Sequence, residues 1–261
     1  MKKLLLASFA ATCLAQTASA HFLLPYTDQT QIERPGDVPM QLIFWHPFEN
    51  GFVMDLAEPE EFYVIHGGEK TDLTDTLVET AFAGSENTAA SYQASVPVKR
   101  SGDYVVVTVP QPYYEDTEDK YIQQFTKVML NRNGLPTDWS EVLDLPAEIQ
   151  PLNKPYNMIV GSTFSGRVLA DGEPVAGVEI EVEYVAAVPD MAQSSTTTPS
   201  VTTMPGGAVV AISDANGYFT FGVPRAGWWG FAALGAGKTT EFDGKELSQD
   251  AVIWVHAYEM E

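Results

Sequence analysis

The sequence predicts an all-β protein made of two β-sandwich domains of immunoglobulin-like architecture. Short stretches of alternating or β-branched residues recur along the 261-residue chain, and Gly, Pro, Asn and Asp separate them. Long helical periodicity is scarce. The stretches predicted as strands are residues 40–46, 61–66, 104–109, 127–130, 166–169, 178–185, 209–213, 218–223, 230–234 and 251–258.

The first twenty residues predict a cleavable export signal. Lys2 and Lys3 give a basic start, residues 4–15 form an apolar run too short to span a bilayer, and Ala18-Ser19-Ala20 is a small-residue cleavage site. Cleavage after Ala20 would leave His21 as the new N-terminus. We therefore expect a periplasmic protein.

Composition excludes some classes of function. Cys13 is the single cysteine and lies inside the apolar run, so no disulfide can hold the mature chain together. The formal charge is −21, and it becomes −23 when the leader removes two lysines and no acids. Nucleic acid is therefore excluded as an expected partner. The acidic excess also raises the local concentration of cations.

A proline-rich stretch predicts the domain boundary. Pro136, Pro146, Pro151 and Pro155 punctuate it, and a helical turn is expected at residues 139–143. The predicted domains are therefore residues 21–157 and residues 158–261.

The second half carries a recognisable sandwich pattern. Gly166-Arg167-Val168-Leu169 precedes a turn at Asp171-Gly172, and Asn216-Gly217 is a strong hairpin signal. This pattern resembles the carboxypeptidase-regulatory-like sandwich, an accessory module of exported proteins. Between its strands, residues 193–207 are rich in Ser and Thr, which predicts a mobile loop.

His21 is the strongest candidate for a functional residue. If cleavage follows Ala20, an α-amine (ordinary pKa about 7.7) and an imidazole (about 6.5) belong to one residue. Both can be neutral near neutral pH, and together they can close a chelate ring on a divalent metal ion.

The other three histidines are further candidate metal ligands. His46 and His66 end predicted strands, and His256 lies on one face of the last strand. Imidazole favours late transition metals over calcium and magnesium. Residues that could add a ligand, or hold an imidazole in one tautomer, are Glu49, Met54 and Asp55.

Several motifs together resemble a family of exported accessory proteins for nickel uptake. They are His21-Phe22-Leu23-Leu24-Pro25, Arg34-Pro35-Gly36-Asp37, Phe44-Trp45-His46-Pro47-Phe48-Glu49, Pro112-Tyr113-Tyr114-Glu115 and Asp119-Lys120-Tyr121-Ile122. The resemblance implies periplasmic binding of nickel or cobalt and delivery to the membrane components of a nickel/cobalt transporter, without catalysis. His21 and His46 match the family's motifs, whereas Phe22 stands where many members carry an acid.

Two other functions stay open. A terminal histidine plus an internal one on a β-sandwich is also the ligand set of copper enzymes of the histidine-brace type, for which Tyr113, Tyr114 and Tyr121 could form a substrate platform. A structural or adhesive protein without metal is the third reading, because sandwiches host many functions. No hydrolase motif is found in the sequence.

Overall fold

The computed structural model describes residues 21–202 and 209–260, and this part of the chain is built from strands. The all-β prediction is confirmed, with one short 3-10 helix, η1 (Thr74–Thr76), within the described residues. No helix in these ranges is long and apolar enough to cross a membrane. The predicted leader at residues 1–20, with Cys13, lies outside the described residues.

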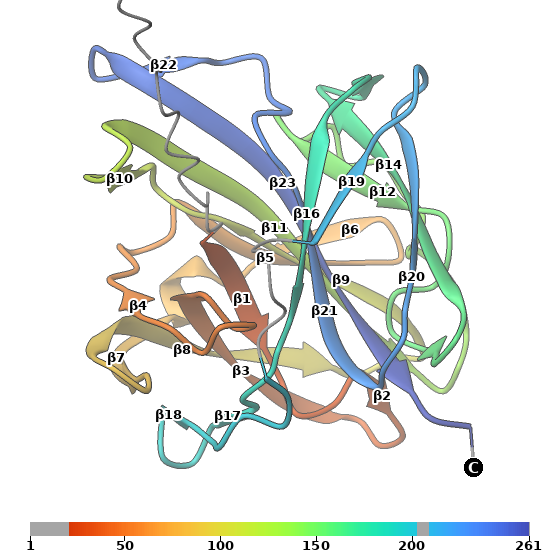
Figure 1. Ribbon diagram of the computed structural model, residues 1–261. Helices are drawn as coiled ribbons and strands as arrows, with labels where there is room; N and C mark the ends of the chain where they lie inside the picture. Colours follow the sequence, from red (N-terminus) through yellow and green to blue (C-terminus); the bar gives the residue numbers. More distant parts are fainter. Residues whose placement is uncertain (1–20, 203–208, 261) are drawn as a thin grey trace, which may run out of the picture.

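Seven strands form the first sheet, which contains the start of the described chain (Figure 1). Its order is β1-β3-β8-β7-β18-β17, with β4 paired to β3. The strands are β1 (Phe22–Tyr26), β3 (Gly36–Trp45), β4 (Val53–Met54), β7 (Val78–Ala83), β8 (Thr88–Val98), β17 (Pro189–Asp190) and β18 (Ser195–Thr196).

Twelve strands form the second sheet, whose main path is β19-β16-β21-β23-β11-β9-β5-β6. The strands on this path are β5 (Glu61–His66), β6 (Glu69–Asp72), β9 (Gly102–Val109), β11 (Lys120–Arg132), β16 (Glu179–Tyr184), β19 (Val209–Ile212), β21 (Gly227–Ala233) and β23 (Lys245–Tyr258). Strands paired beside it are β2 (Gln31–Ile32), β10 (Tyr113–Glu115), β13 (Met158–Ile159) and β22 (Glu241–Phe242).

Four strands form the third sheet, in which β14 pairs with β12, β15 and β20. They are β12 (Glu148–Pro151), β14 (Thr163–Ala170), β15 (Glu173–Pro174) and β20 (Tyr218–Gly222).

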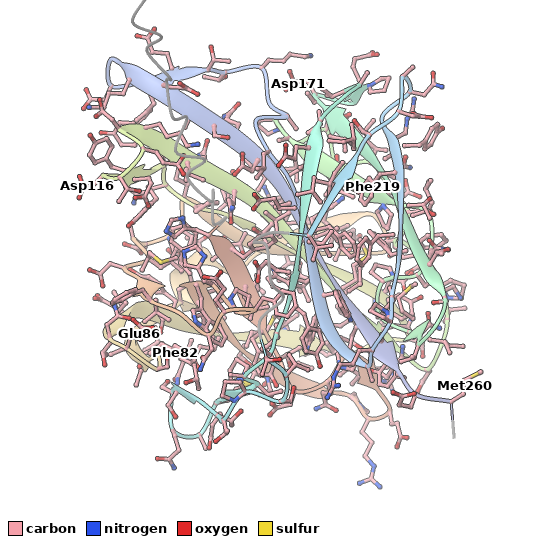
Figure 2. The ribbon with its side chains drawn as sticks, viewed as in Figure 1. Phe82, Glu86, Asp116, Asp171, Phe219 and Met260 are labelled. Atoms are coloured by element: carbon pink, nitrogen blue, oxygen red, sulfur yellow. The ribbon has the colours of Figure 1, made fainter. Side chains whose placement is uncertain are left out.

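The large sheet is the middle of three layers. On β23, Val252 and Trp254 belong to the core shared with the first sheet, whereas Ile253 and Val255 belong to the core shared with the third. Because successive side chains point to opposite faces, a strand covered on both sides reads as a continuous apolar run. Figure 2 shows the outer layers on either side, with Phe82 from β7 in one and Phe219 from β20 in the other.

The middle sheet continues across the predicted domain boundary. β11 pairs in parallel with β23 over eight residue pairs, so strands from the two predicted domains are neighbours in one sheet (Figure 1). Met158, near which the boundary was expected, lies in β13 and pairs with Ala257. The two halves therefore share a layer.

Two local expectations are corrected by the structure. Residues 139–143 form turns and irregular backbone, because the Leu143 N–H bonds to the Glu148 carboxylate in place of a helical carbonyl. Part of the loop expected at residues 193–207 is the strand β18, which pairs with β17 and with Ala83 of β7. Residues 203–207 of that loop lie outside the described residues.

A buried ion pair links the middle sheet to the third sheet. Lys127 Nζ on β11 lies 2.6 Å from Glu148 Oε1 on β12, and their side chains are 1% and 0% exposed. Burial lowers the pKa of Lys127, although Glu148 opposes this shift.

Candidate metal centre

The antiparallel register of β1 and β3 brings His21 and His46 together. Phe22 pairs with Trp45 and Leu23 with Phe44, so extending the ladder by one residue places His21 opposite His46. The two ring centroids are 4.3 Å apart, and both side chains are half-buried. These two histidines, predicted as ligands from the sequence, therefore face each other across a strand pair.

A carboxylate from the β10–β11 hairpin completes the surroundings of His21. Glu115 Oε2 lies 3.2 Å from His21 Nε2. Burial alone would raise the pKa of Glu115, but hydrogen bonds from the hydroxyl and N–H of Thr117, with the nearby histidines, lower it below its usual value. The sequence points to Glu115 only through the motif at residues 112–115.

Burial determines the protonation state of His21. Burial, and to a smaller extent the neighbouring His46, lower the pKa of this imidazole to about 4, although Glu115 opposes the shift. The ring is therefore neutral at pH 7, as a metal ligand must be. Its aromatic neighbours are Phe44 and Tyr113, with ring centroids at 5.5 and 5.9 Å.

Two side chains of the middle sheet hold β1 in place. The Gln124 amide accepts a hydrogen bond from Leu23 N–H at 2.8 Å and donates to the His21 carbonyl at 2.5 Å. Trp254 Nε1 donates to the Leu23 carbonyl at 2.8 Å. Neither residue carries a sequence motif, since their role depends on the packing of one sheet on another.

Replacing Gln124 with Leu should loosen the histidine pair. The substitution leaves Leu23 N–H and the His21 carbonyl without these partners, at a cost of about 1–3 kcal/mol for each buried group. We expect a lower free energy of unfolding in urea and weaker metal binding. Gln29→Leu, at an exposed position, is the control. A change in unfolding free energy no larger than that of the control would contradict the role of Gln124.

The structure places His66 far from this pair. His66 stacks on Tyr104 with centroids 4.2 Å apart, and its Nδ1 lies 2.9 Å from the Asp103 carbonyl. Tyr104 pairs with Leu130 on β11, six residues beyond Gln124, which is roughly 20 Å along the strand. His66 is thus not brought to His21.

His256 is likewise separate. Its ring contacts Trp228 and Tyr258, with centroids at 5.1 and 4.5 Å. Asp250 of β23 is the residue that pairs with Gln124, so His256 also lies six residues along, roughly 20 Å from that level. His256 Nδ1 is buried without a hydrogen-bond partner in the described part of the chain.

The half-buried His256 should make the stability of the protein depend on pH. Burial lowers its pKa from 6.5 to about 4. Between these values the unfolded chain binds more protons, so the unfolding free energy falls as pH drops from 6.5 toward 4, by up to about 3 kcal/mol. His256→Phe should remove this part of the slope in urea unfolding measured across that range. An unchanged slope would show that His256 is not responsible.

The three other residues considered as ligands occupy different surroundings. Met54 pairs with Phe44 across β3 and β4, so it lies on the face that carries the histidine pair, and it is buried. Asp55 is exposed and accepts a hydrogen bond from Ala90 N–H. Glu49 is exposed, in the loop after His46.

Within residues 21–202 and 209–260, no group of three or more His, Cys, Asp or Glu side chains is arranged to hold a metal ion. The side chains at the centre thus provide two imidazoles. A third nitrogen would be the α-amine of His21, which is a backbone group and exists only after cleavage.

The family of the chain follows from its sequence. A family model described as a domain of unknown function, DUF4198, matches residues 18–237. The chain belongs to this family. The match covers His21, His46 and Glu115, and it ends before β23. A comparison with curated proteins finds no match.

This DUF4198 chain is also distantly similar to solved structures. The D0-D1 domain of Intimin is 12% identical, with a TM-score of 0.22, over 88% of this chain and 96% of that one. Dimeric latent PorU from Porphyromonas gingivalis is 9% identical, with a TM-score of 0.24, over 92% and 20%. The Clostridium thermocellum CbhA fibronectin(III)-like modules are 9% identical, with a TM-score of 0.21, over 91% and 95%. Likenesses this distant carry no inference about the site.

Proposed function

We propose that the mature chain, beginning at His21, binds a nickel or cobalt ion in the periplasm and delivers it to the membrane components of a metal-uptake transporter. The observation that carries the proposal is the facing pair of imidazoles, His21 and His46, with ring centroids 4.3 Å apart. The protein acts as a carrier and performs no catalysis.

The donor set follows from the contacts of His21. The Glu115 carboxylate, 3.2 Å from Nε2, favours the tautomer with its proton on that nitrogen, which leaves the Nδ1 lone pair for a metal. Nδ1 is also the nitrogen nearer to the residue's own α-amine. The amine, Nδ1 of His21 and the His46 imidazole then provide three nitrogen donors.

Protons should compete with the metal ion mainly at the α-amine of His21. The pKa of the His21 imidazole is about 4, whereas an α-amine titrates near 7.7 in short peptides. Acid therefore removes the amine first, and the imidazole much later.

The net charge of the mature chain and the resemblance of its motifs to nickel-uptake proteins both support a role as a carrier of metal cations. The mature formal charge of −23 raises the local concentration of metal ions. The motifs around His21 and His46 resemble those of exported nickel-uptake proteins, which favours nickel or cobalt as the cargo.

Copper is the second candidate, and the three-nitrogen donor set favours it. Copper stands highest among the divalent ions in affinity for nitrogen ligands, and a thioether such as Met54 on the same face suits its reduced form. A copper protein of the histidine-brace type would use the same residues.

Titration calorimetry with Ni²⁺, Co²⁺, Cu²⁺ and Zn²⁺ tests the proposal. The mature chain beginning at His21 is compared with a chain that carries one extra N-terminal residue, which blocks the amine chelate. Tight one-to-one binding of nickel or cobalt, lost on extension, supports the carrier. Tight binding of copper with weak nickel and cobalt binding would favour the second candidate. Binding by neither chain would overturn both and favour a structural or adhesive protein.

Replacing Glu115 with Gln should weaken metal binding. The amide can donate to Nε2 as well as accept from it, so the favoured tautomer of His21 is lost. Removing such an outer partner of a metal ligand typically costs 10-fold to 100-fold in affinity. Glu86→Gln, which removes the same charge at an exposed position, should leave the affinity within about twofold. Equal effects of the two variants would assign the loss to net charge.

A further inference from the structure

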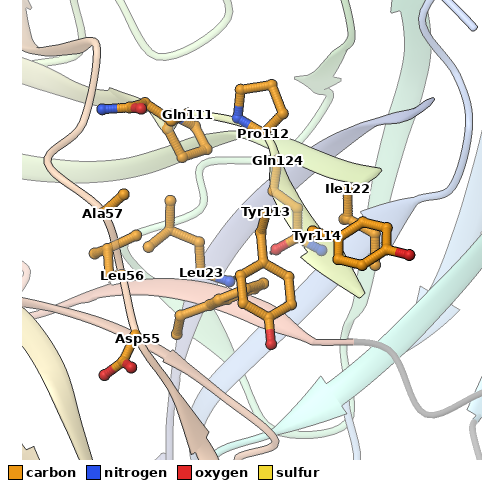
Figure 3. Close-up of a pocket in the computed structure, with 12 residues that line it drawn as sticks. Leu23, Asp55, Leu56, Ala57, Gln111, Pro112, Tyr113, Tyr114, Ile122 and Gln124 are labelled. Atoms are coloured by element: carbon orange, nitrogen blue, oxygen red, sulfur yellow. Dashed lines mark hydrogen bonds between the residues drawn. The ribbon is translucent and has the colours of Figure 1, made fainter. Parts of the chain in front are cut away.

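A cavity adjoins the histidine pair without including it. Its volume is about 150 Å³, and it opens between β1, β10 and the segment after β4 (Figure 3). Phe44 and Tyr113 line the cavity and also pack on the His21 ring. The cavity thus shares a wall with the proposed metal centre.

The volume and the apolar lining of the cavity favour a ligand with one small ring. Leu23, Leu56 and Ile122 provide aliphatic wall, and Pro110 and Pro112 extend it. A cavity of about 150 Å³ lined by apolar side chains is large enough for one benzene ring. A pocket that is mainly apolar with a few polar groups is the usual form of a small-molecule site.

The charge of the lining selects for a cation. Among the described residues that line the cavity, Asp55 alone carries a charge. It lies at the edge of the pocket in Figure 3. The faces of Phe44 and Tyr113 also attract positive charge.

We propose that this cavity binds a small primary amine that carries a single aromatic ring, with the ring among the apolar residues and the ammonium group toward Asp55. The site does not depend on metal, since none of its lining residues belongs to the three-nitrogen donor set proposed above, and Asp55, which the sequence offered as a possible ligand, accepts a hydrogen bond from Ala90 N–H. Anions are disfavoured by Asp55 and by the formal charge of −23 of the mature chain.

The experiment titrates metal-free protein with benzylamine, benzyl alcohol and benzoate, and follows the methyl signals of Leu23, Leu56 and Ile122 by NMR. We expect saturable shifts with benzylamine at roughly millimolar concentration. Benzyl alcohol should bind at least fivefold more weakly, and benzoate more weakly still. No saturable shift with benzylamine, or equal binding of benzoate, would overturn the proposal.

Two variants, each of which removes one negative charge, test whether the preference for the amine depends on Asp55. Asp55→Asn keeps an oxygen to accept the Ala90 N–H, and it should bring benzylamine and benzyl alcohol to within twofold of each other. Asp75→Asn, at an exposed position on η1, should keep the preference for the amine. Loss of the preference in both variants would overturn the role of the cavity. Because metal is absent throughout, these outcomes are independent of the metal titration.

Discussion

A mature chain carrying His46→Ala should bind nickel or cobalt at least about a hundredfold more weakly than the wild type. The expectation follows from the register of β1 and β3, which makes His46 the cross-strand neighbour of His21. Losing a direct ligand costs more than losing an outer partner, for which 10-fold to 100-fold is typical. The His21 amine and imidazole remain in this variant and should retain weak binding. Calorimetric titration at fixed pH measures the difference.

His66 provides the matched control for this loss. His66→Asn keeps an amide N–H near the position of Nδ1, which lies 2.9 Å from the Asp103 carbonyl, while it removes the imidazole. His66 packs on Tyr104, beside the end of β11 that lies away from the His21–His46 pair. We therefore expect the metal affinity of His66→Asn to stay within about twofold of wild type. A loss in His66→Asn comparable to that in His46→Ala would contradict the two-histidine centre.

Lys127→Met should be among the most destabilising single substitutions in the protein. It removes the cation from a buried ion pair and leaves the Glu148 carboxylate, 0% exposed, without its partner. Breaking such a pair costs about 3–5 kcal/mol. Urea unfolding followed by tryptophan fluorescence should show this loss in the unfolding free energy, because Trp254 and Trp229 lie in the two cores.

A second variant separates charge from packing. Lys127→Met combined with Glu148→Gln removes both charges, and the glutamine oxygen can still accept the Leu143 N–H. We expect it to recover at least half of the loss, since no uncompensated charge stays buried. Lys70→Met, in the half-exposed pair with Glu61, should cost no more than about 1 kcal/mol. A double variant as unstable as the single one would show that packing, and not charge, dominates.

Much of the strand content could be predicted from the sequence, because alternation and turn residues are local signals. All ten predicted stretches overlap strands of the structure. The strands of the first sheet that have five or more residues and were not predicted are β1, β7 and β8. β1 is short and contains Pro25, whereas β7 and β8 are rich in small and polar residues at the face away from the core. The third layer also escaped prediction, since an apolar run such as residues 251–255 does not reveal which two sheets cover it.

The candidate site could be predicted in part. The leader and the His-Pro-Phe motif pointed to His21 and His46, but sequence spacing could not show that these two meet, because the β1–β3 register decides it. His66 and His256 were added as candidate ligands because of their positions on predicted strands, but the structure places each of them roughly 20 Å from the level of the pair. Gln124 and Trp254 depend on contacts between distant parts of the chain, for which no local signal exists. Glu115 lies in a motif of the sequence, but its contact with His21 could not be predicted from that motif.

The contact between Trp254 and the Leu23 carbonyl ties the first described strand to the last. β23 also lies between β11 and β21, at the centre of the middle sheet. A ribosome releases β1 long before β23, so the Leu23 carbonyl gains its hydrogen bond from Trp254 only after the last strand has emerged. A polypeptide truncated before its final strand would lack both this anchor and the centre of its largest sheet. In the proposed carrier, competence to hold a metal ion would thus report that synthesis of the chain had been completed.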